Sequence, residues 1–319
     1  MKCVFFGSPE FGAASLRALL ASHHEVLGVI TQPDRPAGRG LKLEMPAVKK
    51  VALEHSLPIF QAEKINTEET LAWLKEKNPE VLVVVAFGAF LGEKLLHFCK
   101  HPPINVHPSL LPELRGAAPM QWSVLRGYKD TGVSTQFMAK AMDAGDILLQ
   151  VNATIGANET SGELSERLKL VGGDLLVETL TKLERGEIKP RPQNHAAATF
   201  APMLEKEHGL VKWNTLTVHE AHDLVRGLHP WPGAYATVAG KRVKLLRSAI
   251  PPEMVFRNAK LSPGEFYASG SSIFVRCKDV CLEILELQPE GKRPMLPREF
   301  VNGMKQGDND DSVFQFDGA

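Results

Sequence analysis

The sequence has little cysteine, no long apolar run and no excess charge of either sign. Four cysteines occur in 319 residues and none forms a C-x-x-C pair, so reduced thiols in a cytoplasmic protein are expected. No apolar run reaches the ~18 residues of a membrane-spanning helix. Lys plus Arg and Asp plus Glu are each 37, which argues against a uniformly basic nucleic-acid-binding protein but permits a local basic patch.

Motifs for nucleotide cofactors and metals are also missing. Residues 7–12, Gly-Ser-Pro-Glu-Phe-Gly, follow a predicted strand and open a helix, but their spacing is not G-x-G-x-x-G. Pro9 removes one backbone donor from this turn, and no Walker sequence occurs. No H-E-x-x-H pattern occurs either. We therefore expect no bound metal, and the α/β pattern alone does not support a dinucleotide-dependent oxidoreductase.

Apolar runs and helical periodicity alternate in the first half of the chain. Strands rich in β-branched residues are predicted at residues 2–6, 25–30, 80–87 and 103–107. Helices are predicted over residues 9–22 and 66–77, the second with a capping box from Asn66 to Glu69. This order predicts an α/β fold with a doubly wound, mostly parallel sheet, Rossmann-like in type, over residues 1–189.

The pattern changes after residue 130. Two strands joined by a turn at Asp143 are predicted, then a long helix with a capping box from Thr160 to Glu163, ending at Gly186. Residues 190–208 contain three prolines and a run of alanines, which is typical of a linker. Residues 209–319 carry one helix and several short strands, which predicts a smaller OB-like β-barrel.

A cationic loop is predicted at residues 32–42, directly after the second strand. Its prolines and glycines are expected to prevent regular structure, and Arg35, Arg39 and Lys42 place positive charge on it. Cations on such a loop suit a phosphate-rich partner, because each can replace a condensed counterion. The alternative is an ordinary solvated surface loop.

The strongest signal for chemistry is the segment Asn105-Val106-His107-Pro108-Ser109-Leu110-Leu111-Pro112. Asn105 and His107 are two residues apart, so on a strand their side chains share one face. They lie at the carboxyl end of a predicted parallel strand, where α/β sheets bind ligands. If the two later strands return to this edge, the carboxylate of Asp143 can reach His107 and hold its tautomer. The alternative is a buried pair that braces a loop.

Five motifs occur in order along nearly the whole chain: GSPEFG, TQPDRPAGRG, NVHPSLLPELRGAAP, MDAGDIL and HPWPGAY. Together they resemble the methionyl-tRNA formyltransferase family, within the wider formyl-folate transferase and hydrolase superfamily. The resemblance implies an enzyme of translation initiation that transfers a formyl group from 10-formyltetrahydrofolate to the α-amine of methionine on initiator tRNA. It implies no metal, no membrane and a cytoplasmic location, and we expect a monomer.

The resemblance also implies roles for individual residues. Asn105, His107 and Asp143 match the catalytic Asn, His and Asp of the family. The folate-contacting segment corresponds to Ser109, Leu110, Leu111 and Pro112. Arg39 matches a basic loop residue that places the tRNA acceptor end, and charge and proximity add Arg35 and Lys42.

A mechanism follows from these residue types. The neutral amine attacks the formyl carbon, and Asn105 and His107 donate hydrogen bonds to the tetrahedral oxyanion. Asp143 orients His107 and positions a water that moves protons from the amine to the folate nitrogen. No covalent enzyme intermediate is needed.

Charge distribution in the second domain agrees with a tRNA partner. Lys and Arg outnumber Asp and Glu between residues 209 and 307, and an acidic tail follows. A basic cluster on one predicted strand comprises Lys241, Arg242, Lys244 and Arg247. Three alternatives stay open: a formyltransferase for a sugar nucleotide or purine precursor, a formyl-folate hydrolase, and a catalytically silent tRNA-binding protein.

Overall fold

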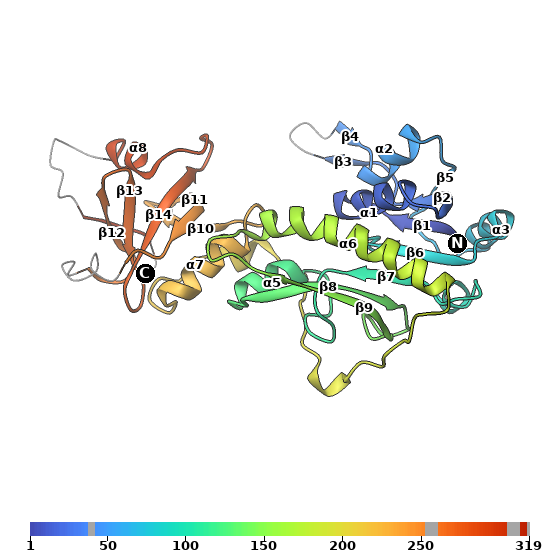
Figure 1. Cartoon of the computed structure of the whole chain (residues 1–319). Coiled ribbons are helices and arrows are strands. Elements are labelled where there is room, and N and C mark those ends of the chain that lie inside the picture. The colour runs from blue at the N-terminus through green and yellow to red at the C-terminus, as the bar shows by residue number, and fades with distance from the viewer. Residues whose placement is uncertain (38–41, 253–260, 305–312, 318–319) are drawn as a thin grey trace. The chain divides into compact units, whose positions relative to one another are not determined.

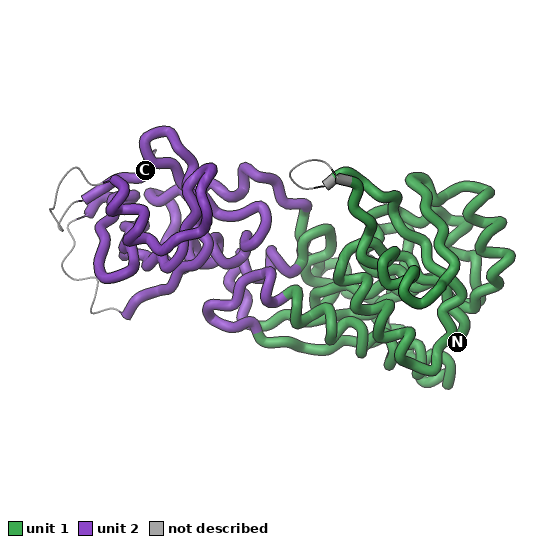
Figure 2. The backbone as a smooth tube through the Cα atoms, turned by 90° about the horizontal axis from the view of Figure 1, so that it is seen from above, with its two compact units in different colours: residues 1–119, 130–154, 165–202 green, residues 120–129, 155–164, 203–319 purple. Residues whose placement is uncertain are grey.

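The computed structural model describes residues 1–37, 42–252, 261–304 and 313–317. The backbone divides into two compact units (Figure 2). Unit 1 comprises residues 1–119, 130–154 and 165–202, and unit 2 comprises residues 120–129, 155–164 and 203–319. Among the helices described, none is both long and apolar enough to cross a membrane.

Unit 1 is built on a seven-stranded sheet (Figure 1). In spatial order its strands are β5 (Ile59–Gln61), β2 (Glu25–Thr31), β1 (Lys2–Gly7), β6 (Val81–Val85), β7 (Ile104–His107), β8 (Asp130–Phe137) and β9 (Ile147–Thr154). The first five are parallel, and β8 and β9 are antiparallel additions. Strand order reverses beside β1, which is the position where doubly wound sheets bind ligands at their carboxyl ends.

Helices cover both faces of this sheet because its central strands are apolar on both sides. On one face, Val4 and Phe6 of β1 join a core with Leu74 of α3 (Glu68–Lys77) and Leu95 of α4 (Glu93–Leu96). The opposite face is covered by α1 (Glu10–Leu20) and α2 (Ala47–Glu54), which contact each other.

The long helix α6 (Ser161–Glu184) packs closely against α1. Gly173 permits this approach, because a Cβ at that position would lie 2.9 Å from the Cβ of Ala18. The helix begins as predicted: Glu163 N donates to Thr160 Oγ1 at 3.2 Å, and Thr160 N donates to Glu163 Oε2 at 2.8 Å. This capping box fixes the first turn of the helix.

Unit 2 contains a curled, six-stranded antiparallel sheet. Its strands, in spatial order, are β10 (Ala234–Val238), β11 (Lys241–Ala249), β14 (Cys281–Pro289), β13 (Ser272–Arg276), β12 (Glu265–Ser269) and β15 (Phe314–Gln315). The same unit contains the helices α5 (Pro119–Leu125), α7 (Val218–Gly227) and α8 (Pro297–Asn302). The ring of Phe316 stacks on Trp213 at 5.4 Å between centroids, inside the core of this sheet.

Asp317 joins the two edges of that sheet. Its backbone N–H donates to Thr237 O of β10 at 2.7 Å, two residues after β15 ends. Its carboxylate accepts from the backbone N–H groups of Ala239 and Gly240 at 3.1 and 2.8 Å. Asp317 is therefore part of the folded sheet, so the prediction of an acidic tail after residue 307 was wrong for this residue.

The predicted fold class is confirmed: a doubly wound, mostly parallel α/β sheet precedes a smaller curled antiparallel sheet. The prediction of an irregular loop at residues 32–42 was wrong in part, because β3 (Arg35–Ala37) and β4 (Lys42–Glu44) form a hairpin. Pro36 is tolerated because each strand of a two-stranded ribbon is an edge, where a missing N–H donor can face outward.

The predicted start of α3 was also wrong. Thr67, not Asn66, caps the helix and accepts from Thr70 N at 3.3 Å. Asn66 instead bonds to a distant loop: its Oδ1 accepts from Gly92 N at 2.6 Å and its Nδ2 donates to Phe90 O at 2.9 Å. A long-range contact thus replaces the local one that the spacing indicates.

Candidate active site

Asn105 and His107 lie on one face at the carboxyl end of β7. In the antiparallel register with β8, Asn105 is opposite Gln136 and His107 is opposite Ser134. His107 is 4% exposed and Asn105 is half-buried. An amide and an imidazole side chain therefore share one edge of the sheet, the imidazole buried and the amide partly exposed.

Asp143 returns to this edge in the turn between β8 and β9. Its Oδ1 accepts from Asn105 Nδ2 at 3.4 Å and from Gln136 Nε2 at 3.2 Å. Its Oδ2 accepts from Gly116 N at 2.9 Å and lies 3.7 Å from His107 Nδ1. The three residues predicted from sequence thus form one cluster, and Gln136 is an additional member.

The other ring nitrogen of His107 has a fixed partner. Nε2 lies 3.0 Å from the carbonyl oxygen of Leu114, and a carbonyl oxygen can only accept, so Nε2 carries a hydrogen. Nδ1 is then the ring nitrogen that faces Asp143, and any proton exchange or donation from His107 must use it. Spacing along the strand could not assign these roles, because Leu114 lies in the following loop with φ of 58°.

The segment from Ser109 to Pro112 is held by two strands of the sheet. Ser134 Oγ donates to Ser109 O at 2.6 Å and accepts from Leu111 N at 3.1 Å. Gln150 Nε2 donates to Leu111 O at 3.0 Å. Ser109 and Leu111 are buried, while Leu110 and Pro112 are half-buried, so Leu110 and Pro112 are the more accessible side chains.

The hairpin of β3 and β4, the cationic hairpin, carries Arg35 and Lys42 and is held by hydrogen bonds at the residue that precedes β3. Lys49 Nζ lies 2.7 Å from Asp34 Oδ2, and Gln61 Nε2 donates to Asp34 Oδ1 at 2.9 Å. These hydrogen bonds, that of Lys49 first, lower the pKa of Asp34. Arg35 is exposed and pairs in register with Glu44. Lys42 pairs in register with Ala37, and Arg39 lies outside the described residues.

The basic strand β11 carries fewer free charges than its composition indicates. Arg247 Nη2 lies 2.6 Å from Glu163 Oε1, and this bond lowers the pKa of Glu163 to about 2. The guanidinium of Arg242 lies 4.0 Å from the ring centroid of Tyr235. Lys244 is half-buried, whereas Lys241 and Arg242 are exposed, so these last two are the most accessible cations of the strand.

Comparison with known proteins identifies the family. Residues 1–180 match the model of the formyl transferase family, described as "Formyl transferase", and residues 203–305 match "Formyl transferase, C-terminal domain". The chain belongs to the formyl transferase family.

Relatives within this family align over nearly the full chain. A methionyl-tRNA formyltransferase of Thermodesulfovibrio yellowstonii is 41% identical over 97% of this chain and 98% of its own length. One of Desulforamulus reducens is 40% identical over 100% of this chain and 99% of its own. The chain is thus similar to these enzymes in both units.

Solved structures share the formyl transferase fold at low identity. HypX from Aquifex aeolicus in complex with tetrahydrofolic acid has a TM-score of 0.64 and 17% identity, covering 98% of this chain and 48% of that one. WlaRD, a sugar 3N-formyl transferase, has a TM-score of 0.66 and 16% identity, covering 92% and 98%. At these identities the likeness concerns the fold alone.

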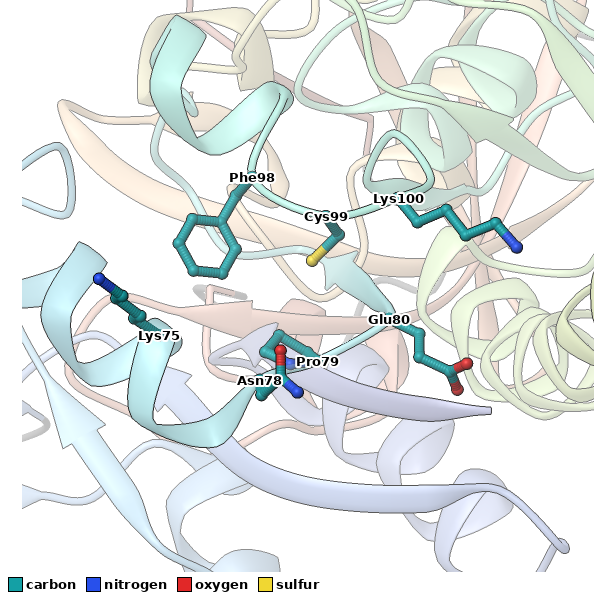
Figure 3. A pocket seen from close by; sticks show the side chains of 7 residues that line it. All are labelled: Lys75, Asn78, Pro79, Glu80, Phe98, Cys99 and Lys100. Atoms are coloured by element: carbon teal, nitrogen blue, oxygen red, sulfur yellow. The ribbon is translucent and has the colours of Figure 1, made fainter.

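A surface pocket of about 500 Å³ lies elsewhere on unit 1 of this formyl transferase. Figure 3 shows its lining, which is drawn from the end of α3, the start of β6 and the segment after α4: Lys75, Asn78, Pro79, Glu80, Phe98, Cys99 and Lys100. It contains none of the predicted site residues and lies at the amino end of β6, whereas Asn105 and His107 lie at the carboxyl end of β7. Burial raises the pKa of Cys99 to about 12, so this thiol is not a ready nucleophile.

One group among the described residues has suitable geometry for a metal: His23, His24 and Glu184. Its donors already bond to protein atoms. Glu184 Oε1 lies 2.7 Å from the amino group of Met1, and Oε2 lies 2.9 Å from His23 Nε2. His97 and His101 have the spacing of two ligands on a helix, but α4 ends at Leu96, so no helix presents them together.

Proposed function

We propose that this formyl transferase moves the formyl group of 10-formyltetrahydrofolate to the α-amine of methionine on initiator methionyl-tRNA. The observation that carries the proposal is the cluster of Asn105, His107 and Asp143 in a chain that aligns end to end with methionyl-tRNA formyltransferases. A catalytically silent protein would have no need to retain all three groups in contact.

The geometry supports oxyanion stabilisation by Asn105. Its amide has two N–H groups, and one of them donates to Asp143 Oδ1 at 3.4 Å. The second is then available to the oxygen that becomes negative as the amine attacks the formyl carbon. A single donor of this kind contributes about 3–4 kcal/mol to the transition state.

Proton transfer falls to His107 and Asp143. Because Nε2 of His107 is bound to Leu114 O, Nδ1 is the nitrogen that donates to the oxyanion or exchanges a proton with the reacting groups. Asp143 lies beside it and positions a water between the attacking amine and the folate nitrogen. The amine gains a C–N bond and loses a proton, while the folate nitrogen loses its bond to the formyl carbon and gains a proton.

Binding roles are assigned to the remaining predicted residues. Ser109, Leu110, Leu111 and Pro112 would contact the folate, with Leu110 and Pro112 offering the more accessible side chains. Arg39, Arg35 and Lys42 would contact the phosphates at the tRNA acceptor end. Residues 1–189 would form the catalytic domain, residues 190–208 a linker whose first part, to residue 202, packs in unit 1, and residues 209–319 a domain that contacts tRNA.

The decisive experiment supplies the protein with 10-formyltetrahydrofolate and either initiator or elongator methionyl-tRNA, and follows formyl-methionyl-tRNA. We expect transfer to the initiator tRNA, and loss of that transfer in His107→Ala. Formylation of neither tRNA, together with formylation of an amino sugar nucleotide, would overturn the proposal. Release of formate from the folate without any amine would instead identify a hydrolase.

A further inference from the structure

Gln193 lies in the proline-rich segment that is predicted to be a linker, yet it is 6% exposed. Its segment attaches to unit 1 on both sides. Arg191 and Ile147 exchange two backbone hydrogen bonds of 2.9 Å, and Phe200 forms a bridge with Arg115. Gln193 is thereby held against the turn that carries Asp143.

The amide nitrogen of Gln193 lies within hydrogen-bonding distance of three oxygens around that turn, so one of its two N–H groups is shared between two acceptors. Nε2 lies 2.9 Å from Asp143 O, 2.7 Å from Gly145 O and 3.2 Å from Gln136 Oε1. Two of these acceptors are backbone carbonyls on either side of Ala144. The contacts therefore hold the backbone of the turn, and not only one side chain.

Arg115 fixes the orientation of the Gln193 amide. Arg115 Nε and Nη2 donate to Gln193 Oε1 at 3.1 and 2.6 Å, and a guanidinium has no acceptor. The Gln193 oxygen must therefore face Arg115, and its nitrogen must face the turn. The same logic turns the oxygen of Gln136 toward Gln193 and its nitrogen toward Asp143 Oδ1.

We infer that Gln193 is a positioning residue for the reaction proposed above, on which this inference rests. It fixes the backbone of the turn from Asp143 to Gly145. Through Gln136, it also fixes the orientation of the Asp143 carboxylate relative to Asn105 and His107. Gln193 does not touch the reacting atoms itself.

The backbone conformation of Asp143 explains why this turn needs stabilising contacts. Asp143 has φ of 52°, a left-handed conformation that costs a non-glycine residue free energy and persists only when its surroundings enforce it. Two carbonyls fixed by one buried amide supply that constraint. A small rotation at Asp143 would move its carboxylate away from His107 Nδ1, which is already 3.7 Å distant.

The test compares the variants Gln193→Glu and Gln193→Leu with a variant of the next residue, Asn194. Gln193→Glu keeps the size and the contact with Arg115 but loses the donor to Asp143 O, and Gln193→Leu loses both. The matched control is Asn194→Ala, which removes only a local bond from Ala196 N to Asn194 Oδ1. We expect kcat to fall about 10- to 100-fold in both Gln193 variants, whereas the KM for the folate and the KM for the tRNA stay unchanged. The control should keep the wild-type kcat.

A second readout does not depend on turnover. Ring ¹⁵N signals of His107, assigned with His107→Gln, should shift in Gln193→Glu because Asp143 leaves Nδ1, and should not shift in Asn194→Ala. Unchanged His107 signals and wild-type kcat in Gln193→Glu would overturn the inference. If the wild-type protein formylates no tRNA, the proposed function fails separately, and the ¹⁵N signals still decide whether Gln193 positions Asp143.

Discussion

Asp143 Oδ2 lies 3.7 Å from His107 Nδ1, while the opposite nitrogen of the ring is bound to the carbonyl oxygen of Leu114. The imidazole is thus held by the backbone on one side and faces the carboxylate on the other. A neutral ring presents an acceptor to Asp143, and a protonated ring presents a donor. Transfer of a proton at Nδ1 during the proposed reaction therefore needs no rotation of the ring.

Removal of any one member of the cluster should slow formyl transfer severely. We expect Asn105→Ala, His107→Ala and Asp143→Ala each to lower kcat by a factor of about 10² to 10⁴, the range for removed oxyanion donors and acid–base groups. Rates under single turnover, with thermal unfolding as a check on the fold, would measure this. Near-normal turnover of His107→Ala would remove the histidine from the mechanism.

Gly145 should not tolerate a side chain. A Cβ there would lie 1.8 Å from Phe137 O, so the turn that carries Asp143 would have to move. We expect Gly145→Ala to lower the free energy of unfolding of unit 1 by at least about 2 kcal/mol and to abolish activity. Gly303→Ala is the control, because the nearest atom to its Cβ, Phe300 O, is 3.4 Å away. Equal stability of the two variants in urea would contradict the expectation.

The strand that carries the proposed catalytic residues Asn105 and His107 could be predicted from sequence, because its signals are local. The two-residue spacing of Asn105 and His107 defines a face, and a Gly-containing turn returns the chain to the same edge. The register of β7 with β8, which places Gln136 opposite Asn105, needs the pairing of two strands that are distant in sequence. The contribution of Gln193 needs a third segment as well, so no local pattern could indicate it.

The same distinction explains the errors in the second unit. The short strands predicted in this unit lie at residues 234–238, 241–247, 272–277 and 281–287 and correspond to β10, β11, β13 and β14, whereas β12 and β15 are not predicted. β15 spans only Phe314–Gln315 and pairs with Glu265 and Phe266. Its position depends on the stacking of Phe316 against Trp213 rather than on any alternation of its own residues.

The free energy of unfolding of unit 2 should decrease at acidic pH because Glu163 becomes protonated. Hydrogen bonds from Arg247, then from Thr160, lower the pKa of Glu163 from 4.5 to about 2. A carboxylate with a lowered folded-state pKa stabilises the protein above its unfolded pKa, and the effect is lost as pH falls through the folded value. The pH window is therefore about 4.5 down to about 2.

Glu163→Gln tests this directly. At pH 7 we expect the variant to be less stable by about 1 kcal/mol, since the ion pair is half-exposed and the capping contribution is modest. The difference from wild type should shrink as the pH is lowered below 4.5 in urea titrations. Arg247→Met, which removes the cation, should lose part of the same pH dependence. A difference that is constant from pH 7 to about pH 3 would contradict the assignment.

Charge on the hairpin should appear in the salt dependence of tRNA binding. Arg35→Ala, Arg39→Ala and Lys42→Ala should each weaken binding and reduce the slope of log K against log salt by about 1 for each phosphate that the variant no longer neutralises. Lys50→Ala is a control, since Lys50 is on α2 beside the hairpin, 3.8 Å from Glu44. The measurement is the affinity for tRNA between low and moderate salt. A slope unchanged in all three variants would assign the phosphate-binding residues elsewhere.

The core of unit 2 also dictates when that unit can finish folding during synthesis. Trp213 can stack in the core only after Phe316 has been synthesised, and β10 gains its hydrogen bond from Asp317 only after that residue has been added. Segments that are far apart in the sequence therefore complete one sheet. Until Phe316 and Asp317 have left the ribosome, β10 and β12 are open edges beside an incomplete core, which is the kind of surface that aggregates or binds chaperones. The last segment of unit 1 ends at Pro202, so the described residues of its sheet are all synthesised before β10. The nascent chain would therefore carry a formed seven-stranded sheet while its second unit is still incomplete.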